Sequence, residues 1–192
     1  LPLLKIIAGD ALRFDWTRLK VFTSFKVIGN LPYNIASPLI WDLVSGCGNC
    51  RKMVFCLQKE VARRICSAPG SREYGALSAW VQSFARVRLE FSIGPKVFRP
   101  RPKVDSAVLS LTPLDPKDTS PDPAKLARLL GICFQKRRKQ LSTILRPYWS
   151  PDLSDWFAAS GVPTSARPEN LSPRHFQEIS SIIFPSHFNI FT

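Results

Sequence analysis

Short apolar runs bounded by turn residues alternate with stretches of helical periodicity over the first 111 residues of the chain. This alternation is typical of strands and crossover helices in a parallel sheet, so the predicted fold class is α/β. Strands are predicted at residues 3–8, 25–29, 53–57, 87–93 and 107–111, and helices at 37–44, 59–66 and 74–84. No helical stretch separates the last two strands, which are therefore expected to pair antiparallel.

A polar segment rich in proline then divides the chain. Proline restricts itself and its predecessor to extended geometry, which favours a linker at residues 114–123. The residues before it, 1–113, are predicted to form one domain. The residues after it, 124–192, are predicted to form a small all-helical domain. Its helices are expected at 124–135, 137–145, 151–160 and 173–183, the last beginning at the strong start signal Ser172-Pro173.

Charge restricts the class of partner. Lys and Arg number 27 against 14 Asp and Glu, a net charge of +13, and such an excess favours a polyanionic partner, with nucleic acid first. The alternative is a basic globular protein without such a partner. Neither a membrane span nor a signal peptide is predicted, so we expect a cytoplasmic protein that does not bind membranes.

The five cysteines are an odd number, which argues against a disulfide framework and for reduced thiols. Cys47 and Cys50 have the spacing of half a zinc site, but no second half follows at ligand spacing. We expect a loop with two free thiols and no metal.

Residues 27–37 are the most informative stretch, because a buried strand ends there in a polar, aromatic turn. Ligands of open α/β sheets lie at the carboxyl ends of strands. The side-chain oxygen of Asn30 and a backbone carbonyl beside Pro32 could each accept a hydrogen of an exocyclic amine, so that the nitrogen lone pair points at an electrophile. Tyr33 offers a face on which an extruded purine could stack. The alternative is an ordinary turn before a helix.

The sequence Asn30-Leu-Pro-Tyr-Asn34 resembles the catalytic motif of the bacterial small-subunit rRNA adenine dimethyltransferases. Further blocks similar to that family follow in order: LQKEVA from Leu57, YGALS from Tyr74, FRPRPKVDSAV from Phe98, FQKRRKQL from Phe134 and ARPENLS from Ala166. The resemblance implies a Rossmann-like methyltransferase sheet followed by a helical domain. It also implies methyl transfer from S-adenosylmethionine to N6 of two adjacent adenosines in the 3′-terminal hairpin loop of small-subunit rRNA, in immature small subunits, by a monomer.

The resemblance also implies roles for residues of this chain. Asn30 and the backbone of Leu31 and Pro32 would bind the target amine, with Tyr33 stacking on the adenine and Phe98 closing on it. Asp10 and Ala11 would bind the adenine of the cofactor, with Asn30 also lining that site. Phosphates of the RNA would contact Arg99, Arg101, Lys103, Lys136, Arg137, Arg138 and Lys139.

Other interpretations of these residues remain open. From the sequence alone, Phe98 is a hydrophobic anchor of its loop, Asp10 a turn residue at a strand end, and the basic residues a solvated face. Glu60 and Asp105 are assigned structural roles, because the reaction needs no strong general base.

The family's glycine-rich turn and the acidic residue for the cofactor ribose have no counterpart before Asp10. We therefore expect an amino-terminally truncated chain that is inactive alone and exposes a hydrophobic sheet edge. A second hypothesis is a non-catalytic rRNA-binding or ribosome-assembly factor. A third is a relative of the resistance methyltransferases of large-subunit rRNA, which the FRPRPKVDS and FQKRRKQL blocks disfavour.

Overall fold

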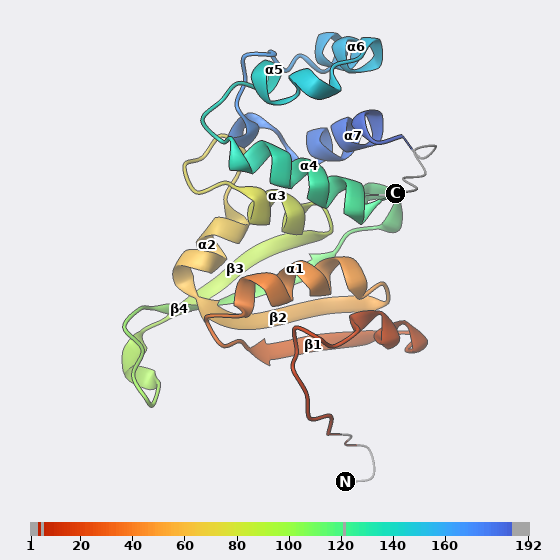
Figure 1. The fold of residues 1–192 in the computed structure, drawn as a ribbon. Coiled ribbons are helices and arrows are strands. Elements are labelled where there is room, and N and C mark those ends of the chain that lie inside the picture. Colours follow the sequence, from red (N-terminus) through yellow and green to blue (C-terminus); the bar gives the residue numbers. More distant parts are fainter. Residues whose placement is uncertain (1–3, 5, 121, 186–192) are drawn as a thin grey trace.

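The computed structural model describes residues 4, 6–120 and 122–185. Four strands form one mixed sheet in the order β1-β2-β4-β3 (Figure 1). These are β1 (Phe25–Asn30), β2 (Cys50–Gln58), β3 (Ala85–Ile93) and β4 (Ser106–Pro113). β1 pairs parallel with β2, whereas β4 runs antiparallel to both β2 and β3. The antiparallel pairing of the last two strands is thus confirmed, and β4 lies inside the sheet rather than at its edge.

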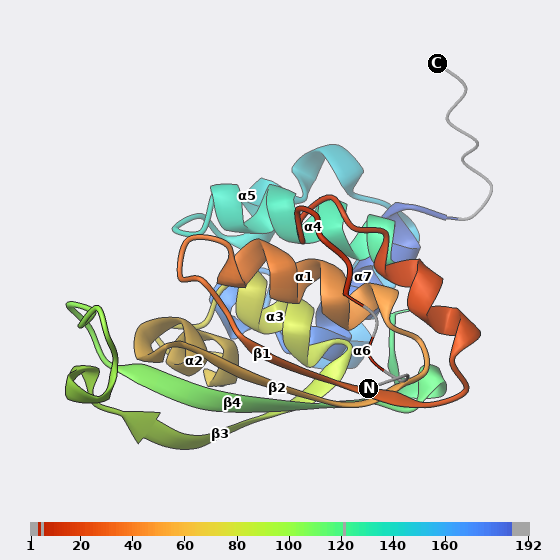
Figure 2. The ribbon, with the colours of Figure 1, turned by 90° about the horizontal axis from the view of Figure 1, so that it is seen from below.

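Three helices cover one face of this sheet: α1 (Ala36–Gly46), α2 (Lys59–Cys66) and α3 (Ala76–Gln82) (Figure 2). Strand side chains alternate between faces, and those that point toward the helices form the core. Met53, Phe55 and Leu57 of β2 and Leu109 and Leu111 of β4 are at most 1% exposed. No described element covers the opposite face, where Ile28 of β1 is 86% exposed.

The second half of the chain is helical, as predicted. Its helices are α4 (Pro123–Gln135), α5 (Leu141–Ile144), α6 (Pro151–Ser160) and α7 (Pro173–Ile183). The Asp122 side chain caps α4 by accepting hydrogen bonds from the amides of Ala124 and Lys125, and Ser172 caps α7 at the His175 amide. Short 3-10 turns lie at η1 (Trp16–Val21), η2 (Pro95–Val97), η3 (Pro116–Asp118), η4 (Arg146–Tyr148) and η5 (Pro168–Asn170).

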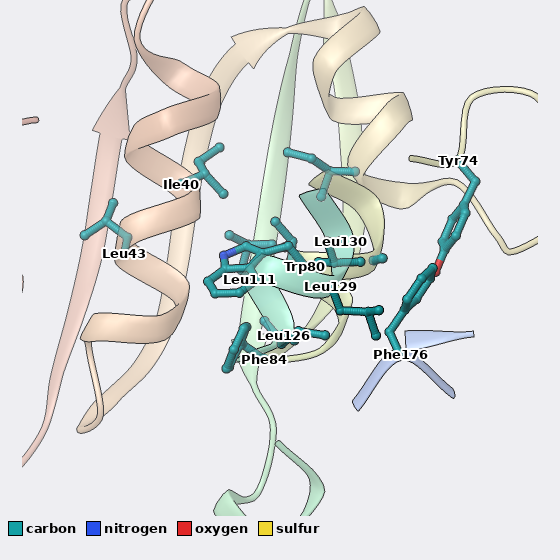
Figure 3. Packing of buried hydrophobic residues seen from close by; sticks show 14 of the residues in the cluster. Ile40, Leu43, Tyr74, Trp80, Phe84, Leu111, Leu126, Leu129, Leu130 and Phe176 are labelled. Atoms are coloured by element: carbon teal, nitrogen blue, oxygen red, sulfur yellow. The ribbon is translucent and has the colours of Figure 1, made fainter. Parts of the chain in front are cut away.

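Aromatic side chains join these layers. Trp41 of α1 and Trp80 of α3 stack with centroids 4.2 Å apart, and the Trp80 indole donates a hydrogen bond to the Trp41 carbonyl. Tyr74 is completely buried and points toward Phe176 of α7 (Figure 3). The buried hydrophobic residues of both halves form one cluster, so the division into domains 1–113 and 124–192 with a linker at 114–123 stays a prediction.

The strand predicted at residues 3–8 is wrong in the part that can be judged. Leu3 and Lys5 lie outside the described residues, and the described residues 4 and 6–8 form no strand. Ile6 is 83% exposed and Ile7 63%. A strand needs a neighbour for its hydrogen bonds, and no described segment pairs with these residues or with the free edge of β1.

The helix predicted at residues 137–145 is also wrong. Residues 136–139 form a turn, closed by a hydrogen bond from the Lys139 amide to the Lys136 carbonyl, and only α5 is helical. The amides of Leu141 and Ser142 donate to the carbonyls of Ala166 and Thr164 instead of to carbonyls one helical turn earlier, so the helix does not extend back through residues 137–140.

Candidate functional site

The turn after β1 is an extension of the sheet. Asn30 pairs with Cys56 in the parallel ladder, and the Leu31 amide then donates a 2.9 Å hydrogen bond to the Cys56 carbonyl. The Leu31 side chain is buried, and its Cδ2 lies only 3.0 Å from where a Cβ on Gly29 would be. Glycine at position 29 therefore lets the turn fold back closely on the strand. Asn30 and Pro32 are exposed, and Tyr33 is half-buried.

These residues line one wall of an open cleft of about 290 Å³, which we call the NLPY cleft. Other residues of its lining come from the loop between β3 and β4. The seven lining residues are Asn30, Leu31, Pro32, Tyr33, Phe98, Pro100 and Pro102. All five residues predicted as catalytic are therefore brought together, although they come from segments more than 60 residues apart in the sequence.

Two lining residues and one neighbour were not predicted. Pro100 and Pro102 complete the wall that Phe98 begins, and the alternation of proline and basic residues in the loop is the signal that could have found them. The third is Ser106 at the start of β4, whose Oγ lies 2.7 Å from the Tyr33 hydroxyl. Ser106 is 73 positions from Tyr33, and no local sequence pattern predicts the contact.

The charges around the NLPY cleft are basic. Arg99, Arg101 and Lys103 are exposed on the loop that carries Phe98. The two nearby carboxylates do not line the cleft. Asp105 forms an ion pair with Lys59 at 3.2 Å, and Glu60 forms one with Arg64 at 2.9 Å.

A second cleft of about 300 Å³, the Asp10 cleft, contains Asp10 and Ala11. It is lined by Ile7, Gly9, Asp10, Ala11, Phe14, Trp16 and Leu19. The Asp10 carboxylate accepts a 2.9 Å hydrogen bond from the Leu12 amide, and its other oxygen lies 3.7 Å from the Arg13 Nε. Asn30 lines the NLPY cleft and not this one, so the three predicted cofactor residues do not share a cleft.

The predicted phosphate contacts in the second half divide into two kinds. Lys136, Arg138 and Lys139 are exposed on the turn after α4. Arg137 is half-buried, and its guanidinium donates a 2.7 Å hydrogen bond to the Arg72 carbonyl and lies 3.6 Å from the Glu169 carboxylate. Arg137 therefore connects the helical half to the loop before α3.

The thiols are free in the described structure. Cys47, which follows α1, and Cys50, the first residue of β2, are both buried. Burial raises the pKa of Cys47 to about 11, so this thiol is neutral at pH 7. Within the residues that the structure describes, no three His, Cys, Asp or Glu side chains are grouped to hold a metal ion. Nor is any described helix long and apolar enough to cross a membrane.

Two solved structures are similar to this fold. A dimethyladenosine transferase from Plasmodium falciparum superposes with a TM-score of 0.71 and 27% sequence identity, covering 90% of this chain and 70% of that one. The 23S rRNA methyltransferase ErmE superposes with a TM-score of 0.61, covering 95% of this chain and 72% of that one. Its identity of 19% shows the shared fold alone. The fold is therefore that of the Rossmann-like methyltransferases, with a helical carboxy-terminal part.

The sequence comparisons narrow this class to one family. Residues 2–184 match the family described as ribosomal RNA adenine dimethylase, and the chain belongs to it. A ribosomal RNA small subunit methyltransferase A from Oleidesulfovibrio alaskensis is 52% identical over 93% of this chain and 64% of its own length. One from Pseudomonas savastanoi is 42% identical, over 95% of this chain and 68% of its own length. The chain thus spans about two thirds of these relatives.

Proposed function

We propose that the protein to which this chain belongs transfers methyl groups from S-adenosylmethionine to N6 of two adjacent adenosines in the 3′-terminal hairpin loop of small-subunit rRNA. It would act as a monomer in the cytoplasm, during maturation of the small ribosomal subunit. The observation that carries the proposal is the NLPY cleft, where an amide oxygen, a backbone turn and two aromatic rings surround a space of about 290 Å³.

Two acceptors on one wall can orient the target amine. The Pro32 carbonyl already accepts a 3.1 Å hydrogen bond from the Ile35 amide, which points to the neighbouring Leu31 carbonyl as the backbone acceptor. With the Asn30 Oδ1 as the second acceptor, both amino hydrogens are bound and the nitrogen lone pair is directed outward. Orientation of this kind supplies much of the rate when no strong base is needed. The amine proton is lost to solvent as the nitrogen becomes cationic.

The two aromatic rings bind the base itself. Tyr33 and Phe98 both line the cleft, so that an adenine extruded from its hairpin would stack on one ring and be closed over by the other. Base stacking on aromatic side chains is sequence-tolerant, and the selectivity for adenine therefore rests with Asn30 and the Leu31 carbonyl. This division of roles also fits two successive adenosines, because each presents the same amine.

The Asp10 cleft fits the adenine ring of S-adenosylmethionine. Asp10 would supply an acceptor for the ring's amine, the Ala11 backbone would contact the ring, and Phe14, Trp16 and Leu19 would provide apolar contacts. When bound, the cofactor supplies the electrophilic methyl group. Among the described residues of this cleft, only Asp10 has a charged side chain.

The basic residues would position the RNA. Arg99, Arg101 and Lys103 border the NLPY cleft, and Lys136, Arg138 and Lys139 lie exposed on the turn after α4. Contacts of such side chains with phosphates fix register without reading sequence. Arg137 contributes less directly, because its guanidinium is bound to the loop before α3.

The test is a transfer assay with labelled S-adenosylmethionine and unmethylated small ribosomal subunits. We would compare this chain with a preparation extended by the amino-terminal part of the Oleidesulfovibrio relative. The extended form should transfer label, and Asn30→Ala should lower the rate by roughly a hundredfold to a thousandfold, the usual loss when a positioned polar group is removed. The exposed position of Asn30 predicts an unchanged melting temperature.

A second function is favoured by one observation, namely that Asp10 and Asn30 lie in separate clefts. A protein that keeps the base-binding cleft without a joined cofactor site would bind rRNA without modifying it, as an assembly factor. If both preparations bind small subunits and neither transfers label, this second function is correct.

A further inference from the structure

The Tyr33 hydroxyl has a partner that base stacking does not require. It lies 2.7 Å from the Oγ of Ser106, which is completely buried at the start of β4. Tyr33 itself is half-buried, and its ring forms part of the NLPY cleft. The hydroxyl therefore lies at the interior end of the ring.

The two ends of this hydrogen bond differ in how firmly they are fixed. Ser106 lies between two neighbouring strands, with Gln58 of β2 and Ile93 of β3 as its partners. One residue earlier, the Asp105 carbonyl accepts a 3.0 Å hydrogen bond from the Lys59 amide, and the Asp105 carboxylate pairs with the Lys59 Nζ. Tyr33, in contrast, belongs to neither a strand nor a helix. The bond therefore restrains the tyrosine rather than the serine.

We propose that Ser106 is a positioning residue that sets the angle of the Tyr33 ring. A tyrosine side chain has two torsions, and a hydrogen bond at the far end of the ring restricts both. The ring then keeps one face toward the cleft before the base arrives, so less orientational freedom is lost on stacking. This inference rests on the proposed function, because it assigns the geometry of the same cleft.

The arrangement also explains why three separate sequence blocks meet here. Tyr33 comes from the NLPY turn, Lys59 from the LQKEVA block, and Asp105 with Ser106 from the end of the FRPRPKVDS block. The contacts between Lys59 and Asp105 hold the start of β4 in place. The hydrogen bond from this fixed position, between Ser106 and Tyr33, then restrains the tyrosine ring.

Removal of either hydroxyl tests the proposal. The variants are Tyr33→Phe, which keeps the ring, Ser106→Ala, and the double variant. The probe is an RNA hairpin with 2-aminopurine at the first target position, whose fluorescence reports stacking of that base. Each single variant should lower the stacked population roughly threefold to tenfold, the range for loss of one hydrogen bond. The double variant should lose no more than either single variant, because both remove the same bond.

Ser110→Ala is the matched control. Ser110 is also buried in β4, and its Oγ donates a 2.6 Å hydrogen bond to the Glu90 carboxylate. It lies outside the NLPY cleft, so its loss should lower stability without changing stacking. In the preparation that transfers methyl groups, Tyr33→Phe and Ser106→Ala should lower kcat by the same factor and leave KM for the RNA unchanged. A purely structural role would make Ser106→Ala resemble Ser110→Ala.

The outcomes separate this proposal from the function on which it rests. If the unmodified protein stacks the base and both single variants do so equally well, the proposal is overturned and the function stands. Additive losses in the double variant also overturn it. If Ser106→Ala does not fold, Tyr33→Phe decides alone. If the unmodified protein neither stacks the base nor transfers methyl groups, the proposed function fails first.

Discussion

The two clefts are nearly equal in size, at about 290 and 300 Å³, but they are supported differently. The NLPY cleft is built on strand ends, with Leu31 in a ladder hydrogen bond and Phe98 on a loop between two paired strands. The Asp10 cleft lies on a segment with no strand, attached largely through η1 and two hydrogen bonds from the Asn49 side chain to the Lys20 and Phe22 carbonyls.

This difference shows what a motif needs in order to become a site. The residues of the NLPY cleft have their structural neighbours within the described chain, so distant segments meet in one place. Asp10, which was predicted to bind the cofactor, lies on a segment that belongs to no strand of the described sheet. A short sequence motif forms a site only where the sheet places the remaining lining residues next to it.

The largest effect in this comparison should come from Phe98. Phe98→Ala is expected to lower both hairpin affinity and the transfer rate roughly tenfold to a hundredfold, the range measured when an aromatic stacking partner is truncated. Val97→Ala is the control, because Val97 is the adjacent residue and is 70% exposed outside the cleft. Equal losses in the two variants, measured by binding titration, would show that Phe98 is only a hydrophobic anchor of the loop.

A smaller effect should show that the segment of the Asp10 cleft opens more readily than the strand that carries the NLPY cleft. Asn49→Ala removes two hydrogen bonds, of 3.0 and 2.9 Å, that attach the end of η1. Amide hydrogen exchange over residues 16–22 should accelerate by about tenfold. Amides of β1 should exchange as before. A parallel acceleration in β1 would contradict the view that the segment around Asp10 is attached separately from the sheet.

The smallest effect concerns two adjacent arginines. Arg137 is bound to the loop before α3, whereas Arg138 is exposed to solvent. Arg138→Ala should lower the salt dependence of RNA binding by about one phosphate contact and leave stability unchanged. Arg137→Ala should instead lower the free energy of unfolding by about 1 kcal/mol, because its hydrogen bond to Arg72 is lost. Salt titrations and thermal melts of both variants measure this. The same salt slope for both would remove the distinction.

Much of the fold could be predicted because its signals are local. The helices at 59–66, 151–160 and 173–183 begin and end where the sequence predicted, and the four strands of the sheet were predicted to within a few residues. Apolar periodicity and capping residues are read from neighbours along the chain. The same reasoning predicted a strand at 3–8 and a helix at 137–145. The described part of the first pairs with no other segment, and the amides of Leu141 and Ser142 bind carbonyls more than 20 residues further along the chain.

The candidate site was predictable in its residues and not in its supports. The Asn30 turn and Phe98 were named from the motif and the resemblance, and the structure brings them together. The contacts that support the NLPY cleft are long-range: Tyr33 with Ser106, and Lys59 with Asp105. The Asn49 bonds to the end of η1, which support the segment of the Asp10 cleft, are long-range as well. Serine and lysine are common surface residues, and the register that sets Gln58 opposite Ser106 is what brings Lys59 and Ser106 to this place.

The hydrogen bond from the Leu31 amide to the Cys56 carbonyl affects how the cleft responds to thermal unfolding. It makes the cleft wall the last step of the sheet ladder, so the wall survives for as long as β1 stays paired with β2. The turn that carries Asn30 and the pairing of β1 with β2 should then be lost at one temperature. Base binding at this turn is therefore limited to temperatures at which β1 and β2 remain paired.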